Sequence, residues 1–178
     1  MFSNPETSPR PDDPARPERR KDFVKRKLID DANAARQSND LQALARSLIE
    51  IGRLERNRHH LESARGYYEE AVAVYRALNE PLRLAHTVRH VGDILQDSGQ
   101  LRRAEPCYSE ALKIYRAHSE TPPLDVANAI RGFALLQGEF GKTTEAISLW
   151  REARAHYAAV DVQAGVEDCD RQIARLST

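Results

Sequence analysis

A set of small and aromatic residues that occurs three times places the strongest constraint on how this chain folds. One copy consists of Ala104, Tyr108, Ala111 and Tyr115. A second copy lies 40 residues upstream and a third lies 42 residues downstream, at Ala64, Tyr68, Ala71 and Tyr75, and at Ala146, Trp150, Ala153 and Tyr157. Each copy forms one face of an α-helix, because its members are separated by four, three and four residues. A repeat of this length indicates an all-α solenoid of stacked helical units.

Each of these helices is preceded by another that carries a small residue for close packing, namely Gly52, Gly92 or Ala134. Glycine inside a helix costs about 1 kcal/mol relative to alanine, so a close helix–helix contact is a reason to retain it. Gly99 and Gly141 mark turns between paired helices. We therefore predict three helix pairs, at 40–57 and 60–78, at 82–97 and 100–118, and at 124–138 and 142–159.

The repeats are flanked by segments of different character. Residues 1–21 contain five prolines among polar residues, which predicts a disordered or extended tail. Residues 22–38 have apolar residues at helical spacing and are predicted to form a single helix. The unit at 39–162 is expected to hold three repeats, at about 40–80, 81–121 and 122–162. Residues 163–178 are expected to form a capping helix with a polar outer face, which gives about eight helices in total.

Composition narrows the class of protein. The chain has 178 residues with 27 basic and 27 acidic side chains, and this neutral balance argues against a nucleic acid partner. The basic residues near position 20 are therefore interpreted as the solvated face of the first helix. Cys107 and Cys169 form neither a disulfide framework nor a metal pattern, which favours reduced thiols in a cytoplasmic protein. Neither a secretory signal nor an apolar run of membrane-spanning length is visible, so we expect no membrane association.

The order of small and aromatic residues, with Gly52 and Gly92 on the preceding helices, resembles the tetratricopeptide repeat over residues 40–160. The interval of 40 to 42 residues and the segment 104–114 are similar to the long repeats of the kinesin light chain type. The resemblance implies a right-handed superhelix in which the first helix of each pair lines a concave, peptide-binding groove. One subfamily clamps the terminal carboxylate of chaperone tails, but the matching positions here include Ile49, His90 and Gly132, so that clamp is not reproduced.

The resemblance also indicates which side chains face the groove. The matching positions are Arg46, Ile49, Arg53, Arg56, His86, Arg89, Asp93, Gln96, Asn128, Arg131 and Leu135. Guanidinium groups suit carboxylates, so an acidic peptide is one candidate ligand. The alternative is that the arginines pair with neighbouring carboxylates, such as Glu50, Glu55 and Asp93, and form a solvated face. Both interpretations stay open at this point.

His86, His90 and Asp93 form the sharpest local cluster, because their spacing of four and three residues puts them on one helix face. Two imidazoles and a carboxylate can hold a metal ion, but a polar groove wall is the favoured interpretation. The sequence contains no glutamate between the histidines as in zinc proteases, no phosphate-binding loop and no nucleophile motif. We therefore expect no cofactor and no enzymatic activity.

The sequence thus predicts a non-enzymatic protein–protein interaction module. It would bind a peptide or helix of a partner protein in the groove, and an acidic segment is the ligand that the arginines favour. The alternatives are a self-associating scaffold or assembly factor and, more remotely, a metal site at His86, His90 and Asp93.

Overall fold

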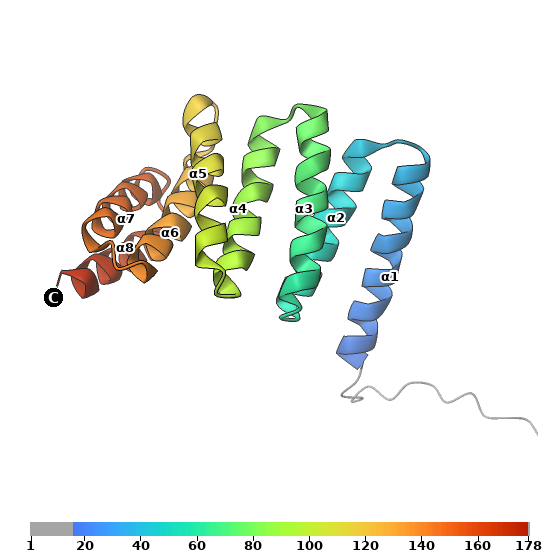
Figure 1. Ribbon diagram of the computed structural model, residues 1–178, viewed down its shortest axis with the longest axis horizontal. Helices are drawn as coiled ribbons and strands as arrows, with labels where there is room; N and C mark the ends of the chain where they lie inside the picture. Colours follow the sequence, from blue (N-terminus) through green and yellow to red (C-terminus); the bar gives the residue numbers. More distant parts are fainter. Residues whose placement is uncertain (1–15, 178) are drawn as a thin grey trace, which may run out of the picture.

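The computed structural model describes residues 16–177, which form a row of helices without a strand among them (Figure 1). The helices are α1 (Arg16–Gln37), α2 (Leu41–Asn57), α3 (Leu61–Leu78), α4 (Pro81–Asp97), α5 (Leu101–Ala117), α6 (Pro123–Glu139), α7 (Thr143–Ala158) and α8 (Gln163–Leu176). Neighbours in sequence are neighbours in space, from α1 at one end of the molecule to α8 at the other. The predicted all-α solenoid of antiparallel helix pairs is confirmed.

The three predicted helix pairs agree with α2–α7 to within one residue at each boundary. By contrast, α1 begins at Arg16, six residues before the predicted start at residue 22. The added turns contain Arg, Glu and Lys, which are good helix formers, and Pro17 lies in the first turn, where its missing N–H costs little. Residues 1–15 of the predicted tail lie outside the described part of the chain.

A side-chain cap and left-handed turn residues separate the helices of the pairs. The Asp40 carboxylate accepts a hydrogen bond from the Ala43 amide at 2.9 Å and so caps the start of α2. Gly99 and Gly141 both have φ of +73° in the turns that follow α4 and α6. His59 takes the equivalent place after α2 with φ of 59°, a left-handed conformation that is less favourable for a side-chain-bearing residue than for glycine.

The repeated small and aromatic residues form the core. All twelve members of the three copies are at most 3% exposed, and they pack in clusters that run along the solenoid. Close approach explains the glycines, since a Cβ on Gly52 would lie only 2.9 Å from the Tyr68 ring. A Cβ on Gly132 would lie 2.6 Å from the ring of Tyr108, which belongs to the preceding repeat. The aromatic residues therefore set the distance both within and between repeats.

A ladder of ion pairs joins the second helices of successive repeats. Arg36 of α1 pairs with Glu70 of α3 at 2.5 Å, and the same contact recurs 40 residues later as Arg76 with Glu110 at 2.6 Å. A third pair, Arg116 with Glu152, joins α5 to α7 at 2.8 Å. Exposed pairs of this kind each contribute about 0–1 kcal/mol, so the ladder fixes the register of the repeats more than it stabilises them.

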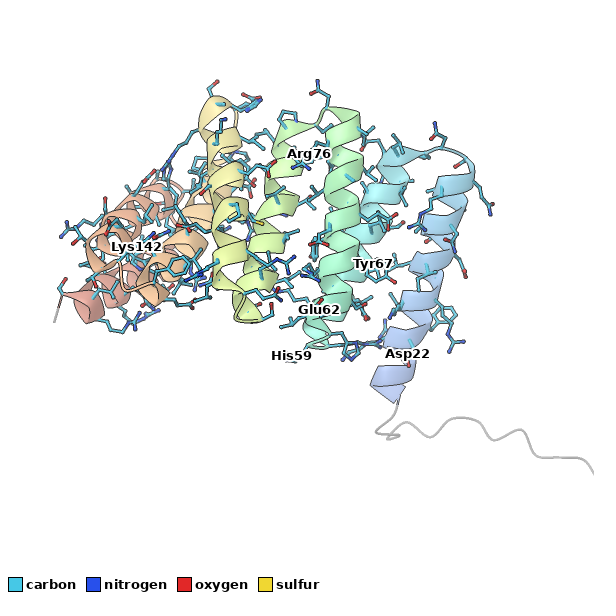
Figure 2. All side chains as sticks on the ribbon, viewed as in Figure 1. Asp22, His59, Glu62, Tyr67, Arg76 and Lys142 are labelled. Carbon is cyan, nitrogen blue, oxygen red and sulfur yellow. The ribbon has the colours of Figure 1, made fainter. Side chains whose placement is uncertain are left out.

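The first helix is held by charges near the α2–α3 turn. Figure 2 shows Asp22 of α1 and His59 of that turn at the same end of the molecule, and Asp22 pairs with Arg58 at 2.8 Å. Lys25 lies 3.1 Å from Glu55, which is 2% exposed. Burial alone would raise the pKa of Glu55, but hydrogen bonds from Lys25 and Ser63 outweigh it and lower the pKa. The suggested pairing of Glu55 with a groove arginine is therefore wrong, because Lys25 occupies that position.

None of the helices within residues 16–177 is long and apolar enough to cross a membrane.

Candidate functional site

Two adjoining pockets lie between α2 and α4, on the first helices of the first two repeats. The larger one, of about 700 Å³, is lined by Ile49, Glu50, Arg53, Arg56, Asn57, His59, Leu61, Tyr68, His86, His90 and Asp97, and we call it the Tyr68 pocket. The second, of about 540 Å³, is lined by Arg46, Ile49, Glu50, Tyr75, Leu82, Arg83, His86, Thr87, Pro122 and Asp125, and we call it the Tyr75 pocket. Because Ile49, Glu50 and His86 line both, the two pockets adjoin, and we refer to them together as the α2–α4 groove.

The structure separates the predicted groove residues into three groups. Five of them line the α2–α4 groove, namely Arg46, Ile49, Arg53, Arg56 and His86. A second group, Arg89, Asp93 and Gln96, takes part in a network beside it. The third group, Asn128, Arg131 and Leu135, lies on α6 and lines neither pocket. Of these, Asn128 accepts a hydrogen bond from Tyr157 at 2.8 Å and Arg131 pairs with Asp168 of α8 at 2.9 Å.

Asp93 is the centre of the network beside the groove. Arg89 donates to its Oδ2 at 2.7 Å, and the Tyr108 hydroxyl lies 2.9 Å from its Oδ1. Burial would raise the pKa of Asp93, but a hydrogen bond with His90 and the charge of Arg89 outweigh it and lower the pKa. The Arg89 side chain is only 11% exposed. Arg89 therefore acts as an internal partner of Asp93, and it lines neither pocket.

His86 and His90 are held as neutral imidazoles. Their Nε2 atoms are 3.2 Å apart, and Arg89 donates to Nε2 of His90 at 2.9 Å. Because a guanidinium can only donate, Nε2 of His90 is an acceptor. The hydrogen between the two imidazoles is therefore carried by Nε2 of His86. Burial lowers the pKa of His86 to about 4, with added repulsion from His90 and Arg89, and burial also lowers the pKa of His90.

This arrangement gives the metal hypothesis no geometric support. The His90 lone pair at Nε2 already accepts from Arg89, a cation that would repel a metal ion. The oxygens of Asp93 are engaged by Arg89 and Tyr108. Among residues 16–177, no three His, Cys, Asp or Glu side chains come together in positions that could hold a metal ion.

The exposed arginines differ in how they are engaged. Arg53 pairs with Glu50 at 2.5 Å, with side chains that are 63% and 45% exposed. Arg56 pairs with Asp97 at 2.7 Å and lies 3.5 Å from Asp93. Arg46 is exposed and forms no ion pair with another residue in the part of the chain that the structure describes. Pairing with neighbouring carboxylates therefore accounts for Arg53 and Arg56 but not for Arg46.

The sequence did not indicate that Tyr68 and Tyr75 line the groove, because their spacing is that of a helix face that packs in a core. Both are core residues, 3% and 2% exposed, and both also line a pocket. For Tyr68 the repeats hold a signal, because the residue that bonds the equivalent Tyr108 is not conserved in type between the first and second repeats. Arg53 stands where Asp93 stands, 40 residues later.

Comparisons with known proteins agree with the fold. The tetratricopeptide repeat family model matches residues 44–81, which span most of α2 and all of α3. The crystal structure of BtubC (BKLC) from P. vanneervenii superposes with a TM-score of 0.70 at 15% identity, covering 92% of this chain and 75% of that one. A second crystal structure contains the nearly identical TPR-like repeats of a protein described as a kinesin light chain from Podosopora anserina, with a TM-score of 0.54, 14% identity and coverage of 93% and 97%.

A comparison with curated protein sequences found no match. At 14–15% identity the two structures show the fold alone. The predicted resemblance is confirmed: residues 44–81 match the tetratricopeptide repeat, and the chain has the fold of kinesin-light-chain-type repeat proteins.

Proposed function

We propose that this chain is a non-enzymatic protein-interaction module that holds a segment of a partner protein in the α2–α4 groove. The observation that carries the proposal is the pair of adjoining pockets that share Ile49 and His86. Two pockets in line suit successive side chains of one extended peptide or one helix face. Curved surfaces of stacked helical repeats commonly serve in this way, and a few buried anchor residues supply most of the affinity.

The state of the reactive side chains supports binding over catalysis. Cys107 and Cys169 are the potential nucleophiles, and burial raises the pKa of both thiols, that of Cys169 to about 11. Protonated thiols are poor nucleophiles near neutral pH. The imidazoles of His86 and His90 are hydrogen-bonded to each other, and Nε2 of His90 also accepts from Arg89, so this nitrogen is not free to act as a general base.

The arginines of α2 that line the groove favour an acidic ligand. Arg46 has no ion-pair partner among the described residues, and the Arg53–Glu50 pair is exposed on both sides. Such surface pairs are worth about 0–1 kcal/mol, so Arg53 can exchange Glu50 for a carboxylate of the ligand at little cost. The two arginines lie seven residues apart on α2, on either side of Ile49, so an acidic segment with an apolar residue between its charges would match this surface.

Selection of peptides from a displayed library against the full chain, followed by titration of the best binder, tests this function. Replacing Arg46 and Arg53 together with glutamate should weaken binding at least about tenfold and flatten its salt dependence. The matched control replaces Arg102 and Arg151 with glutamate, which makes the same charge change at exposed positions outside both pockets. Equal loss in both variants would contradict binding in the groove.

A further inference from the structure

The first repeat lacks the hydrogen-bond acceptors that satisfy the equivalent tyrosine in the second repeat. In the second repeat, the Tyr108 hydroxyl lies 2.9 Å from Asp93 Oδ1 and 2.8 Å from Gln96 Oε1. The tyrosine at the equivalent place in the first repeat, 40 residues earlier, is Tyr68. At the places of Asp93 and Gln96, the first repeat has Arg53 and Arg56. A guanidinium only donates hydrogen bonds, so both acceptors have been replaced by donors.

The Tyr68 hydroxyl is consequently left with no protein acceptor. The residue is 3% exposed, and it forms no hydrogen bond with any side chain or backbone group of the described residues. Burial raises its pKa, although the positive charges of Arg56 and Arg53 act in the opposite direction, so the phenol stays protonated near neutral pH. The hydroxyl itself is not fully enclosed, because Tyr68 lines the pocket, so water or a ligand group can take the place of the missing protein acceptor.

The same pocket supplies two cations with donors to spare. Arg53 and Arg56 line the Tyr68 pocket together with Tyr68 itself. Arg53 pairs with Glu50 and Arg56 with Asp97, and these carboxylates are 45% and 47% exposed, so water competes for both ion pairs. Arg56 also lies 3.5 Å from the less exposed Asp93. Each guanidinium carries five N–H donors, of which these contacts use only one or two. Three side chains with hydrogen-bond donors therefore line one cavity.

We propose that Tyr68, Arg53 and Arg56 form an oxyanion subsite, which binds a carboxylate or phosphate group of the ligand. This inference rests on the proposed function, because it assigns a ligand chemistry to one half of the α2–α4 groove. The anion would accept from the Tyr68 hydroxyl and from both guanidinium groups, and hydrogen bonds to a charged group are among the strongest that proteins form. The third repeat offers no equivalent site, since Trp150 takes the place of Tyr68 and Leu135 that of Arg53.

Titration of the full chain with glutarate and with inorganic phosphate tests the subsite without knowledge of the partner. Binding is followed by the NMR signals of the Arg53 and Arg56 side chains. Tyr68→Phe keeps the ring and removes only the hydroxyl, so it should weaken binding of the preferred anion about tenfold or more. Tyr108→Phe is the matched control, because it removes an equivalent hydroxyl outside the pocket. It should leave the affinity for the anion unchanged.

The two variants also differ in stability when no ligand is present. Tyr68→Phe deletes an unpartnered hydroxyl and should leave the melting temperature unchanged or raise it. Tyr108→Phe deprives Asp93 of a donor and should lower it. A clear loss of stability in Tyr68→Phe would show that the hydroxyl has a partner within the protein and would overturn the proposal.

Each titration result has a defined meaning. Preference for glutarate assigns the subsite to a carboxylate, and preference for phosphate assigns it to a phosphoryl group. If neither anion shifts the arginine signals, or if Tyr68→Phe and Tyr108→Phe bind equally well, the subsite does not exist. Peptide binding that still depends on Arg46 and Arg53 would in that case leave the proposed function standing, so the two failures are distinguishable.

Discussion

At the scale of single residues, the polar groups beside the groove differ in whether they can still change their charge. Asp93 is fixed by Arg89 and Tyr108, whereas the two histidines can accept protons as the pH falls. In the unfolded chain a histidine has a pKa of about 6.5. In the folded chain the pKa of His86 is about 4, and that of His90 is also lowered. Protonation therefore favours the unfolded chain.

The sign of the resulting pH dependence follows from these shifts. Above pH ~6.5 both states carry neutral histidines, and the stability is fully present. Between that pH and about 4, the unfolded chain binds protons that the folded chain does not, so the melting temperature should fall across this window. Replacing both His86 and His90 with glutamine should flatten the dependence. A slope that is unchanged in this double variant would mean that other groups cause it.

At the scale of helices, the contact between α5 and α6 depends on a missing side chain. A Cβ on Gly132 would lie 2.6 Å from the ring of Tyr108, which itself packs in the core and cannot move freely. We expect Gly132→Ala to lower the free energy of unfolding by about 1–3 kcal/mol, as overpacking of a filled interior does. Denaturation in urea measures this change.

Gly66 provides the matched control, because it lies inside α3 and a Cβ there meets nothing within 4 Å. The intrinsic preference for alanine should make Gly66→Ala more stable by up to about 1 kcal/mol. If the two glycine-to-alanine substitutions change the free energy of unfolding in opposite directions, the effect of packing is separated from that of helix propensity. A stabilising effect of Gly132→Ala would mean that the repeats can move apart without cost.

Helices are also the scale at which the sequence was most informative. The small and aromatic residues recur at a fixed interval, so they specified the three helix pairs, and Gly52 and Gly92 indicated where helices approach closely. The start of α1 was missed because its first turns lack the apolar periodicity on which the prediction rested. The groove could be predicted only in part, because spacing does not show that Arg89 is buried against Asp93 or that the Tyr68 hydroxyl has no partner.

At the scale of the whole molecule, the two end helices bear on whether copies of the chain can stack end to end. In α8, Glu167 and Asp170 stand 40 residues after Ala127 and Ile130, which are fully buried in the core. In α1, Asp31 stands 40 residues before Ala71, another fully buried position. A further helix packed on either end in the manner of the repeats would bury these carboxylates, which is costly without a compensating cation.

Head-to-tail stacking would moreover bring like charges together. In head-to-tail stacking, α8 of one copy and α1 of the next would pack together like the two helices of one repeat. Asp170 of α8 would then occupy the position of Leu48, and Asp31 of α1 would occupy the position of Ala71 on the facing helix. Asp170 is in addition engaged by Arg154 of α7 at 2.6 Å, a contact that stacking would have to desolvate. We therefore expect no head-to-tail association at accessible concentrations in sedimentation, which argues against self-association through the end helices.

Replacing the carboxylates of Asp31, Glu167 and Asp170 with apolar side chains should allow the chain to associate end to end. A variant with Asp31→Ala, Glu167→Ala and Asp170→Leu restores the residue types found at equivalent positions of the repeats, and it should sediment with a concentration-dependent increase in mass. The control variant replaces Glu120, Glu139 and Glu145 with alanine, which changes the net charge equally at exposed positions away from the two outer faces. Because the association would be heterologous, it should continue beyond dimers instead of closing. Association of the unmodified chain, or of the control variant to the same extent, would show that the end carboxylates do not govern assembly.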